Sequence, residues 1–553
     1  MEPKEQRRAL WTAVAAATGW YAFALAVMYP IANAPVVDSW LYGSAVRRFL
    51  RTGEIRFAGY AQAAPIAQVL YGAVWGRVCG AGSASLTVSM LPIAVLCAVF
   101  FDALVRRCGA SRWQALAAAG LIVCNPCFLF LSFSFMTEVP FLMLVVGAYL
   151  AFAKAGDRGG WGWIAAALCV AGFMIRPFAV MAIAGCVGAA VIDAVGIAGV
   201  RKPSARRSWR QLSSDFVPFV VALIACAIEW RTFQSVVANS WQLQAAEGHF
   251  SEVFEVPIAY YLRAGLLGPL LYLGTVLAPL ALIQFATPKW KRAVVIATAI
   301  IASALFLMRL DNRMPETPEY SCFGGWRNVL ILRGLPNRFL WESGWQYVFL
   351  VIGSFGAAGL VLAGADAAIR LNRAALAVVV GALVYWAAMF PLWFFNDRYY
   401  LPLVPAGAIL LGIAPLPRTR FVRSLAASML LIMGLMSLGG TYSYQRGIGA
   451  LVQTRDELER EGVPRASIDA GYSLNGNDLY RYPVHGIDTM ELEAGIPMIT
   501  SPQLDDYTIS GTPIPGLTVM RQIEWPGPFG VGHRYFYLLK QEHPAGANSA
   551  KKP

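Results

Sequence analysis

Long apolar runs alternate with short polar segments over most of the chain, from Leu10 to Gly440. Most of these runs have roughly 17 to 25 residues, the length that a helix needs to cross the hydrocarbon core of a bilayer. The pattern predicts an α-helical polytopic membrane protein with about thirteen transmembrane helices, and it excludes a soluble globular protein. The expected spans cover residues 10–28, 85–105, 113–125, 137–153, 161–175, 178–200, 216–230, 260–286, 293–308, 347–365, 374–395, 401–414 and 424–440.

Composition agrees with a membrane protein. Of the 553 residues, 57% are hydrophobic and only 14% are charged, whereas about 25% of residues are charged in an average soluble domain. The net charge of +13 would suggest a nucleic-acid partner if it covered a soluble domain. The tail from Thr441 is weakly acidic, however, so the positive excess lies in the membrane part, mainly in short loops. Such loops are typical of the cytoplasmic side of a membrane, and we expect no nucleic-acid partner.

The basic segments also predict the orientation of the chain in the plasma (inner) membrane. The N-terminus and four short loops are rich in Lys and Arg and should stay in the cytoplasm. These loops are 106–112, 201–210, 289–292 and 418–423. The outer loops 31–83, 231–257 and 309–345 then belong to the extracytoplasmic side. We expect a transmembrane domain over residues 1–440 and an extracytoplasmic (periplasmic) C-terminal domain over residues 441–553.

Two short helices are expected in the first outer loop. Residues 39–52 place apolar side chains on one side and arginines on another, which is typical of a helix that lies along the membrane surface. Gly53 should end this helix, and a second, mostly apolar helix begins within residues 64–71. In the tail, residues 466–472 and 535–539 have the pattern of strands, which predicts a small α/β domain.

Two acidic residues are candidates for catalysis, because charged groups at membrane depth are costly and usually functional. Asp38 follows the first span, and Glu138 stands where a later span begins from the same predicted side. Each also has a structural interpretation: Asp38 suits a helix N-cap, and Glu138 suits the first turn of a helix. The two roles are compatible at Asp38, because capping would fix its carboxylate in place.

Further polar residues near this face are candidates for binding substrate. Arg176 stands between two spans, where its structural alternative is a side chain that reaches lipid headgroups. Asp397, Arg398 and Tyr399 lie in a tight turn between two later spans, where an arginine can meet an anionic group. His249 in loop 231–257 could contact the acceptor or a metal, although a solvated loop explains it equally simply.

The layout resembles the GT-C glycosyltransferases, specifically the bacterial relatives of the protein O-mannosyltransferases (the dolichyl-phosphate-mannose-protein mannosyltransferase family) and the lipid A aminoarabinose transferase. The matching features are an acid after the first span followed by surface helices, an acid before a proline in the next outer loop, a late Arg-Tyr-x-x-Pro turn and an extracytoplasmic C-terminal domain. They are carried by Asp38, Glu138, Arg398-Tyr399-Tyr400-Leu401-Pro402 and the tail, whose segment 471–476 is similar to one in some bacterial members.

The chain departs from this family at two places. Ser39 follows Asp38 where the family often has Glu, and Ala64-Pro65-Ile66 stands where many members have Lys-Pro-Pro. The second departure removes a lysine that would bind phosphate in those members.

The resemblance implies an inverting glycosyltransferase that moves a sugar from a polyprenyl-monophosphate donor to an acceptor hydroxyl at the extracytoplasmic face. Asp38 would be the base, Glu138 would orient the acceptor, and the arginines would bind the lipid phosphate. The acceptor could be a glycan, a lipid or a protein, and the sugar is left open. The sequence has no Gly-rich phosphate loop or dinucleotide fingerprint, which disfavours a nucleotide sugar.

No cofactor is expected to be required and no metal site is predicted, although Asp38 and Glu138 could share a divalent cation. Two other functions stay open. One is a polytopic transporter or flippase of a lipid-linked or small substrate, which the lack of an internal sequence repeat disfavours. The other is a ligase or polymerase that uses a diphosphate-linked glycan.

Overall fold

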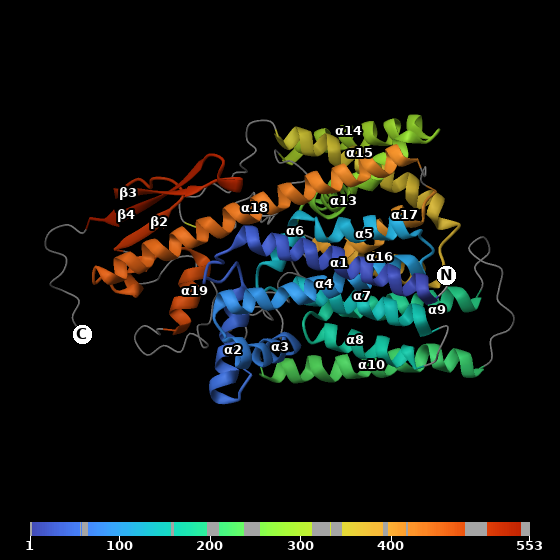
Figure 1. Cartoon of the computed structure of the whole chain (residues 1–553), viewed down its shortest axis with the longest axis horizontal. Coiled ribbons are helices and arrows are strands. Elements are labelled where there is room, and N and C mark those ends of the chain that lie inside the picture. Colours follow the sequence, from blue (N-terminus) through green and yellow to red (C-terminus); the bar gives the residue numbers. More distant parts are fainter. Residues whose placement is uncertain are drawn as a thin grey trace.

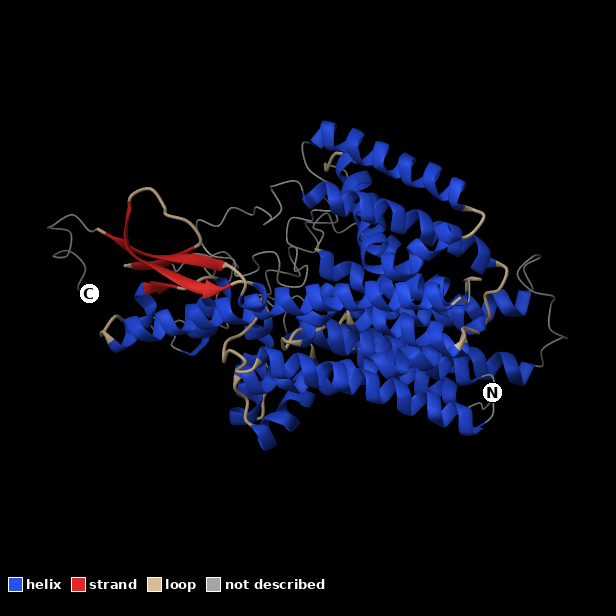
Figure 2. Cartoon of the chain, turned by 45° about the horizontal axis from the view of Figure 1, so that its top comes forward, coloured by secondary structure: helices blue, strands red, loops and turns tan. Residues whose placement is uncertain are grey.

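The structure is a computed structural model of the whole chain. It describes residues 3–55, 57, 65–155, 160–195, 209–236, 255–311, 332, 345–390, 396–415, 419–481 and 506–542. Helices packed side by side along the longest direction of the molecule form most of it, and a small sheet lies beyond one end (Figures 1 and 2). We call this the sheet end. The N-terminus lies at the opposite end (Figure 1), which we call the N-terminal end.

Nine helical segments in the described part of the chain are long and apolar enough to cross a membrane. The first five are Arg7–Met28 in α1 (Pro3–Met28), α4 (Ser83–Arg107), α7 (Glu138–Ala155), Pro177–Val195 with α9 (Val180–Val195), and Asp215–Phe233 in α10 (Trp209–Val236). The other four are Ile258–Ala286 with α12 (Ile258–Tyr260) and α13 (Gly268–Ala281), Trp290–Leu307 in α14 (Trp290–Asp311), Tyr347–Ala368 in α15 (Trp345–Ala368), and α18 (Arg420–Arg460). A tenth crossing combines α5 (Arg112–Val123) and α6 (Pro126–Ser132), which meet at a bend of 64°.

The remaining expected spans also correspond to helices. They are α8 (Trp161–Phe173), α16 (Arg373–Met389) and α17 (Val404–Ile413), which are apolar but shorter. The polytopic helical fold is therefore confirmed, while length and composition support nine or ten full crossings among the described residues and not thirteen. The sequence count was higher because apolar runs too short to span the bilayer have the same pattern as those that do.

Glycines set how closely some of these helices approach one another. A Cβ added at Gly274 of α13 would lie 1.9 Å from the carbonyl oxygen of Gly353 on α15. One added at Gly185 of α9 would lie 2.3 Å from the carbonyl oxygen of Ala377 on α16. Contacts of this kind are common in membranes, where small residues let helix backbones pack directly.

Two short helices at the sheet end confirm the expectation for the first outer loop. They are α2 (Ser39–Thr52) and α3 (Ile66–Cys79), which pack on each other. Gly53 ends α2 with φ +75°, and its N–H donates to the carbonyl oxygen of Phe49. Loop 231–257 is described only up to residue 236 and from residue 255. Loop 309–345, apart from its ends and residue 332, lies outside the described residues.

The C-terminal part continues directly from the helical bundle. α18 has 41 residues, so the expected boundary at residue 440 falls inside it, and the helix runs out of the bundle beside the sheet (Figure 1). The sheet has the order β1-β2-β4-β3, in which only the pair β1–β2 is parallel. Its strands are β1 (Ile468–Asp469), β2 (Tyr507–Ser510), β3 (Leu517–Pro526) and β4 (His533–Gln541).

The small α/β unit expected in the tail is present, with one difference in its first element. The strand expected over residues 466–472 is only two residues long, because α19 (Tyr472–Arg481) already begins at Tyr472. The strand expected over residues 535–539 lies within β4. The sheet packs on α18, where a Cβ added at Gly447 would lie 2.9 Å from the indole nitrogen of Trp525.

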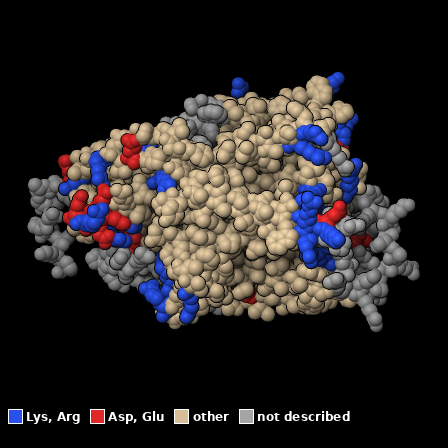
Figure 3. All heavy atoms as spheres, in the orientation of Figure 1, with Lys and Arg blue, Asp and Glu red and all other residues tan. Residues whose placement is uncertain are grey.

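Charged side chains gather at the two ends of the bundle, and the surface between them is nearly free of charge in the view of Figure 3. Ion pairs at the N-terminal end join neighbouring turns or helices. They are Asp215–Arg373 at 2.6 Å, Asp102–Arg106 and Lys289–Asp366. An apolar belt between two charged ends is the surface of an integral membrane protein.

Candidate active site

Four charged side chains predicted from the sequence meet at the sheet end of the bundle. Nη1 of Arg398 donates to Oδ2 of Asp38 over 2.9 Å, and Nη2 of Arg176 donates to Oε1 of Glu138 over 2.6 Å. Nε of Arg398 lies 3.5 Å from the same Glu138 oxygen, so the two ion pairs form one group. We call these four residues the outer cluster.

Asp38 is held at the turn that leads into α2. The residue before it, Val37, has φ +49°, which is unusual for a β-branched residue. The Asp38 side chain makes no capping hydrogen bond to α2, so the N-cap interpretation is wrong for its carboxylate. Oγ of Ser39 accepts a hydrogen bond from the N–H of Val36, within the same turn. The Asp38 carboxylate interacts with side chains from other parts of the chain.

Glu138 and Arg176 are positioned by the ends of their own elements. Glu138 is the first residue of α7, so the first-turn interpretation holds together with its place in the outer cluster. Arg176 has extended backbone, as expected before a proline, and precedes the short helix η1 (Pro177–Ala179). Its Nε donates to Oγ1 of Thr137 over 2.7 Å. Arg176 therefore contacts two successive residues at the start of α7.

Arg398 lies in the short helix η5 (Asp397–Leu403), which hydroxyl groups of tyrosines anchor to the bundle. Tyr385 on α16 donates to the carbonyl oxygen of Tyr399 over 2.7 Å. Tyr400 donates to the carbonyl oxygen of Ala264 over 3.0 Å. These bonds fix the part of the turn that directly follows the arginine, whose guanidinium reaches the two carboxylates.

The outer cluster is balanced in charge and largely withdrawn from solvent. The side chain of Glu138 is 1% exposed, that of Arg398 is 6% and that of Asp38 is 15%. Buried charges need opposite partners, because an isolated ion loses its hydration at high cost. The second carboxylate oxygen of Glu138, Oε2, is buried and has no hydrogen-bond partner among the described residues. This oxygen can accept a hydrogen bond from a bound molecule.

Burial lowers the pKa of Arg176, but the nearby Glu138 carboxylate, together with Tyr42 and Tyr399, raises it, and the net shift is upward, so the guanidinium stays protonated. Tyr399 lies beside both guanidinium groups, with its ring centroid 5.8 Å from Cζ of Arg176 and 5.5 Å from Cζ of Arg398. An aromatic ring at these distances attracts both cations through its face. Tyr399 therefore lies beside the outer cluster, and its role in substrate binding stays a prediction.

Tyr42 and Tyr472 also belong to the site, although the sequence did not identify them. Burial raises the pKa of Tyr42, and the nearby Asp38 carboxylate raises it further, so its hydroxyl stays protonated. The signal for Tyr42 was its place one helical turn after Asp38. Tyr472, from α19, donates its hydroxyl hydrogen to Oδ1 of Asp38 over 2.8 Å. Nothing in its own sequence surroundings indicates this contact, because Asp38 lies 434 positions away.

Two other candidates remain, Asp397 and His249. Asp397 is buried next to Arg398, and its carboxylate interacts electrostatically with Tyr272 and Tyr400. It therefore belongs to a neighbouring group of tyrosines. His249 lies outside the described residues, and its role stays a prediction.

No group of three or more His, Cys, Asp or Glu side chains in the described ranges could hold a metal ion. Asp38 and Glu138 each interact with an arginine, as described above. The divalent cation that they could share remains a prediction.

Comparisons with known proteins found similar solved structures. ArnT from Cupriavidus metallidurans bound to undecaprenyl phosphate is 13% identical, with a TM-score of 0.40, over 94% of this chain and 97% of that chain. The apo state of ArnT is 14% identical, with a TM-score of 0.37, over 95% and 98%. Archaeal oligosaccharyltransferase AglB from Archaeoglobus fulgidus, in complex with an inhibitory peptide and a dolichol-phosphate, is 15% identical, with a TM-score of 0.40, over 86% and 59%.

No family model and no curated protein matches the chain. ArnT, the lipid A aminoarabinose transferase, and AglB are both members of the GT-C superfamily, the group that the sequence resembles. At TM-scores of 0.40 or less, these similarities assign no function to the chain.

Proposed function

We propose that the chain is an inverting glycosyltransferase that moves a sugar from a polyprenyl-monophosphate carrier to an acceptor hydroxyl at the sheet end of the bundle. The observation that supports this most is the outer cluster itself. It combines two carboxylates with two guanidinium groups at the sheet end of the bundle. A carboxylate can abstract a proton, and guanidinium groups can bind a lipid phosphate.

Asp38 is the base in this proposal. Its carboxylate takes the proton from the acceptor hydroxyl as the hydroxyl oxygen attacks the anomeric carbon of the donor. The bond between that carbon and the phosphate oxygen breaks, and the bonding electrons leave with the polyprenyl phosphate. Because attack and departure occur on opposite sides of the carbon, the configuration is inverted. Asp38 then releases its proton to water.

Arg398 and Arg176 stabilise the departing phosphate. Arginine binds phosphate through a planar fork of N–H donors, and such charge-assisted bonds are stronger than neutral ones. The phosphate is a stable anion, so the reaction needs electrostatic stabilisation more than a strong general acid. The ring of Tyr399 keeps the two guanidinium groups close together, which prepares a site of positive charge for the lipid headgroup.

Glu138 holds the two arginines and offers its remaining oxygen to the acceptor. Its Oε1 contacts Arg176 at 2.6 Å and Arg398 at 3.5 Å, which limits the repulsion between the two cations. Its buried Oε2 can accept a hydrogen bond from the acceptor, and this would orient the hydroxyl that attacks.

The sheet end is extracytoplasmic in this proposal, and residues 441–553 form the extracytoplasmic domain. The support comes from the basic segments near the N-terminal end, such as Arg106-Arg107 and Lys289 to Arg292, because short basic loops stay in the cytoplasm. The protein would then act on a donor presented in the outer leaflet of the plasma membrane. Undecaprenyl phosphate and dolichol phosphate, named for the similar structures, identify the class of lipid to test first.

The direct test is to reconstitute the full-length protein in liposomes with lipid extract from cells that lack it. Mass spectrometry then follows the release of undecaprenyl monophosphate and the change in the cell-envelope glycans. We expect monophosphate release that the Asp38→Asn variant does not support. Release of the diphosphate would instead indicate a ligase or polymerase. Movement of an intact lipid-linked sugar across the bilayer, without release of either lipid, would indicate a flippase.

A further inference from the structure

The C-terminal part of the chain reaches the outer cluster through one side chain. The hydroxyl of Tyr472 donates to Oδ1 of Asp38 over 2.8 Å, while Nη1 of Arg398 donates to Oδ2 over 2.9 Å. Each oxygen of this carboxylate thus has its own donor, one from the C-terminal part of the chain and one from the helical bundle. Tyr472 is buried, and it stands at the first position of α19.

The turn before Tyr472 is built from side chains that fix its position. Oδ1 of Asp469, at the end of β1, accepts from the N–H of Gly471 over 3.0 Å and from Nδ2 of Asn475 over 2.7 Å. Oδ1 of Asn475 accepts from the N–H of Ala470 over 2.9 Å. Gly471 has φ +86°, a conformation that other residues rarely adopt. The start of α19 is therefore held at one place at the end of the sheet.

α19 also packs on the beginning of α2, beside Asp38. Oγ of Ser473 donates to the carbonyl oxygen of Val37 over 3.1 Å. The ring of Trp40 meets that of Tyr472 edge to face at 6.1 Å. A Cβ added at Gly476 would lie 2.5 Å from the Trp40 ring, so only glycine permits this approach. The contact between Tyr472 and Asp38 is thus part of a packed interface between the two helices.

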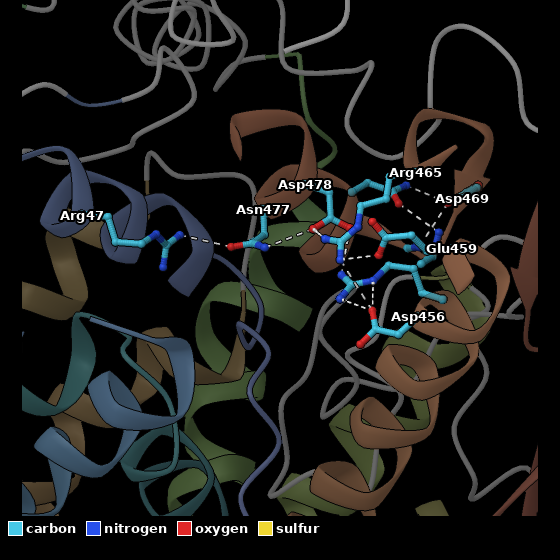
Figure 4. Close-up of polar contacts among 11 residues, drawn as sticks. Arg47, Asp456, Glu459, Arg465, Asp469, Asn477 and Asp478 are labelled. Atoms are coloured by element: carbon cyan, nitrogen blue, oxygen red, sulfur yellow. Dashed lines mark hydrogen bonds and ion pairs between the residues drawn. The ribbon is translucent and has the colours of Figure 1, made fainter. Parts of the chain in front are cut away.

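A polar network extends this interface to α18 (Figure 4). Nη2 of Arg47 on α2 donates to Oδ1 of Asn477 over 3.1 Å, and Nδ2 of Asn477 donates to Oδ1 of Asp478 over 3.2 Å. Asp478 in turn accepts from Arg455 on α18 over 2.8 Å and from Arg465 over 3.4 Å. α19 is therefore held between the surface helix α2 and the long helix that joins the bundle to the sheet.

We propose that Tyr472 is a positioning residue of the site, which holds the Asp38 carboxylate in the orientation that removes a proton from the acceptor. This inference rests on the proposed function. An oxygen of a carboxylate has two lone pairs, so Oδ1 can accept from Tyr472 and still face an acceptor hydroxyl. Without the tyrosine hydroxyl, both oxygens can turn towards Arg398, which binds carboxylates in pairs of hydrogen bonds. The C-terminal domain then acts as part of the catalytic site.

The first test concerns the contact and does not depend on activity. Thermal unfolding of the full-length protein in detergent is measured for the wild type, Tyr472→Phe, Asp38→Ala and the double variant. Phenylalanine keeps the ring on Trp40, so the fold should survive. We expect Tyr472→Phe to lower Tm by about 1–3 °C in the wild type, the size expected for one hydrogen bond to a charged group, and by much less in Asp38→Ala. If Tyr472→Phe lowers Tm by the same amount in the wild type and in Asp38→Ala, the hydrogen bond between the two side chains is ruled out.

The second test concerns the role, and its readout is the pH profile of undecaprenyl monophosphate release in liposomes. The ionisable groups around Asp38 are Tyr42, Glu138, Arg176, Arg398 and Tyr472. A hydrogen bond to an ionised carboxylate favours the ionised form, so its loss should move the acid limb of the profile to higher pH. We expect Tyr472→Phe to move the acid limb upward by about one pH unit and to lower kcat more than it raises KM.

Tyr535→Phe is the matched control, because Tyr535 lies in β4 of the same domain with its side chain well exposed. It should leave both the pH profile and the coupling unchanged. Tyr472→Phe could lower Tm only when Asp38 is present and still leave the pH profile and kcat unchanged. Tyr472 would then have a structural role and no positioning role. If wild-type protein releases no undecaprenyl monophosphate while the Tm values remain coupled, the proposed function fails and the positioning role fails with it, but the contact stands.

Discussion

The two ends of the helical bundle use ion pairs in different ways. At the N-terminal end, the pairs Asp102–Arg106, Asp215–Arg373 and Lys289–Asp366 each match one acid with one base and join neighbouring turns or helices. At the sheet end, the outer cluster links two acids and two bases through a single Glu138 oxygen.

This difference separates structural ion pairs from groups that can perform chemistry. A pair whose charges satisfy each other has little left to offer a substrate, and its contribution is to hold helices together. A shared cluster instead keeps charged groups close to one another in a buried place, where each acts strongly on a bound molecule. The same kind of substitution should therefore have different effects at the two ends.

The largest effect is expected for Asp38→Asn, which keeps the size of the side chain but removes the base. Loss of a general base typically lowers the rate about 10²–10⁴-fold, and we expect a loss in this range for undecaprenyl monophosphate release. Asp366→Asn provides the matched substitution at the N-terminal end and should leave the rate unchanged. Full activity of Asp38→Asn at wild-type expression would rule out the assigned base.

Glu138→Gln should have the next largest effect, because it leaves two buried guanidinium groups without their shared carboxylate. Removing one partner from a buried ion pair costs about 3–5 kcal/mol of the free energy of unfolding. We expect a lower Tm of the purified protein together with weaker acceptor use in steady-state kinetics. An unchanged Tm would show that the two arginines do not depend on Glu138.

Arg398→Ala should weaken the binding of the donor lipid. A hydrogen bond to a charged group contributes about 1.5–3 kcal/mol, so the Kd for undecaprenyl monophosphate should rise roughly 10- to 100-fold. Binding can be measured by native mass spectrometry in detergent, and Lys289→Ala serves as the control at the N-terminal end. A larger change in the KM of the acceptor than in lipid binding would contradict the assignment of Arg398 to the phosphate.

The smallest effect is expected for the Lys289–Asp366 pair itself. Both side chains are partly exposed, and an exposed ion pair contributes at most about 1 kcal/mol to the free energy of unfolding. Asp366→Asn should therefore lower Tm only slightly, and the shift should shrink further in high salt. A Tm loss as large as that of Glu138→Gln would mean that this separate ion pair stabilises the protein as much as the shared outer cluster does.

Much of the architecture could be predicted because it depends on local patterns. The amphipathic run that follows Asp38 became α2 with the expected bounds, and Gly53 ended it. The apolar runs became helices, since a chain in lipid must satisfy its own backbone hydrogen bonds. Within the described residues, α8, α16 and α17 have apolar patterns but are shorter than the helices that qualify as full crossings.

The candidate site was only partly accessible from the sequence. Asp38, Glu138, Arg176 and Arg398 could be identified because a charge at the edge of an apolar run is costly and therefore conspicuous. Asp397 met the same criterion, yet it lies with a group of tyrosines. Tyr472 could not be found in this way, because a tyrosine in a polar tail carries no such cost.

The apolar helices, their polar ends and the charged residues that could act there follow from the sequence, because hydrophobic length and the cost of burying charge are local properties. Which of these charges are partners depends on the fold, since Arg398 reaches Asp38 across 360 positions and Tyr472 reaches it across 434. Contacts over such separations depend on how whole helices pack, and this packing is set by close approaches, such as those at Gly274 and Gly476, that only glycines at those positions permit.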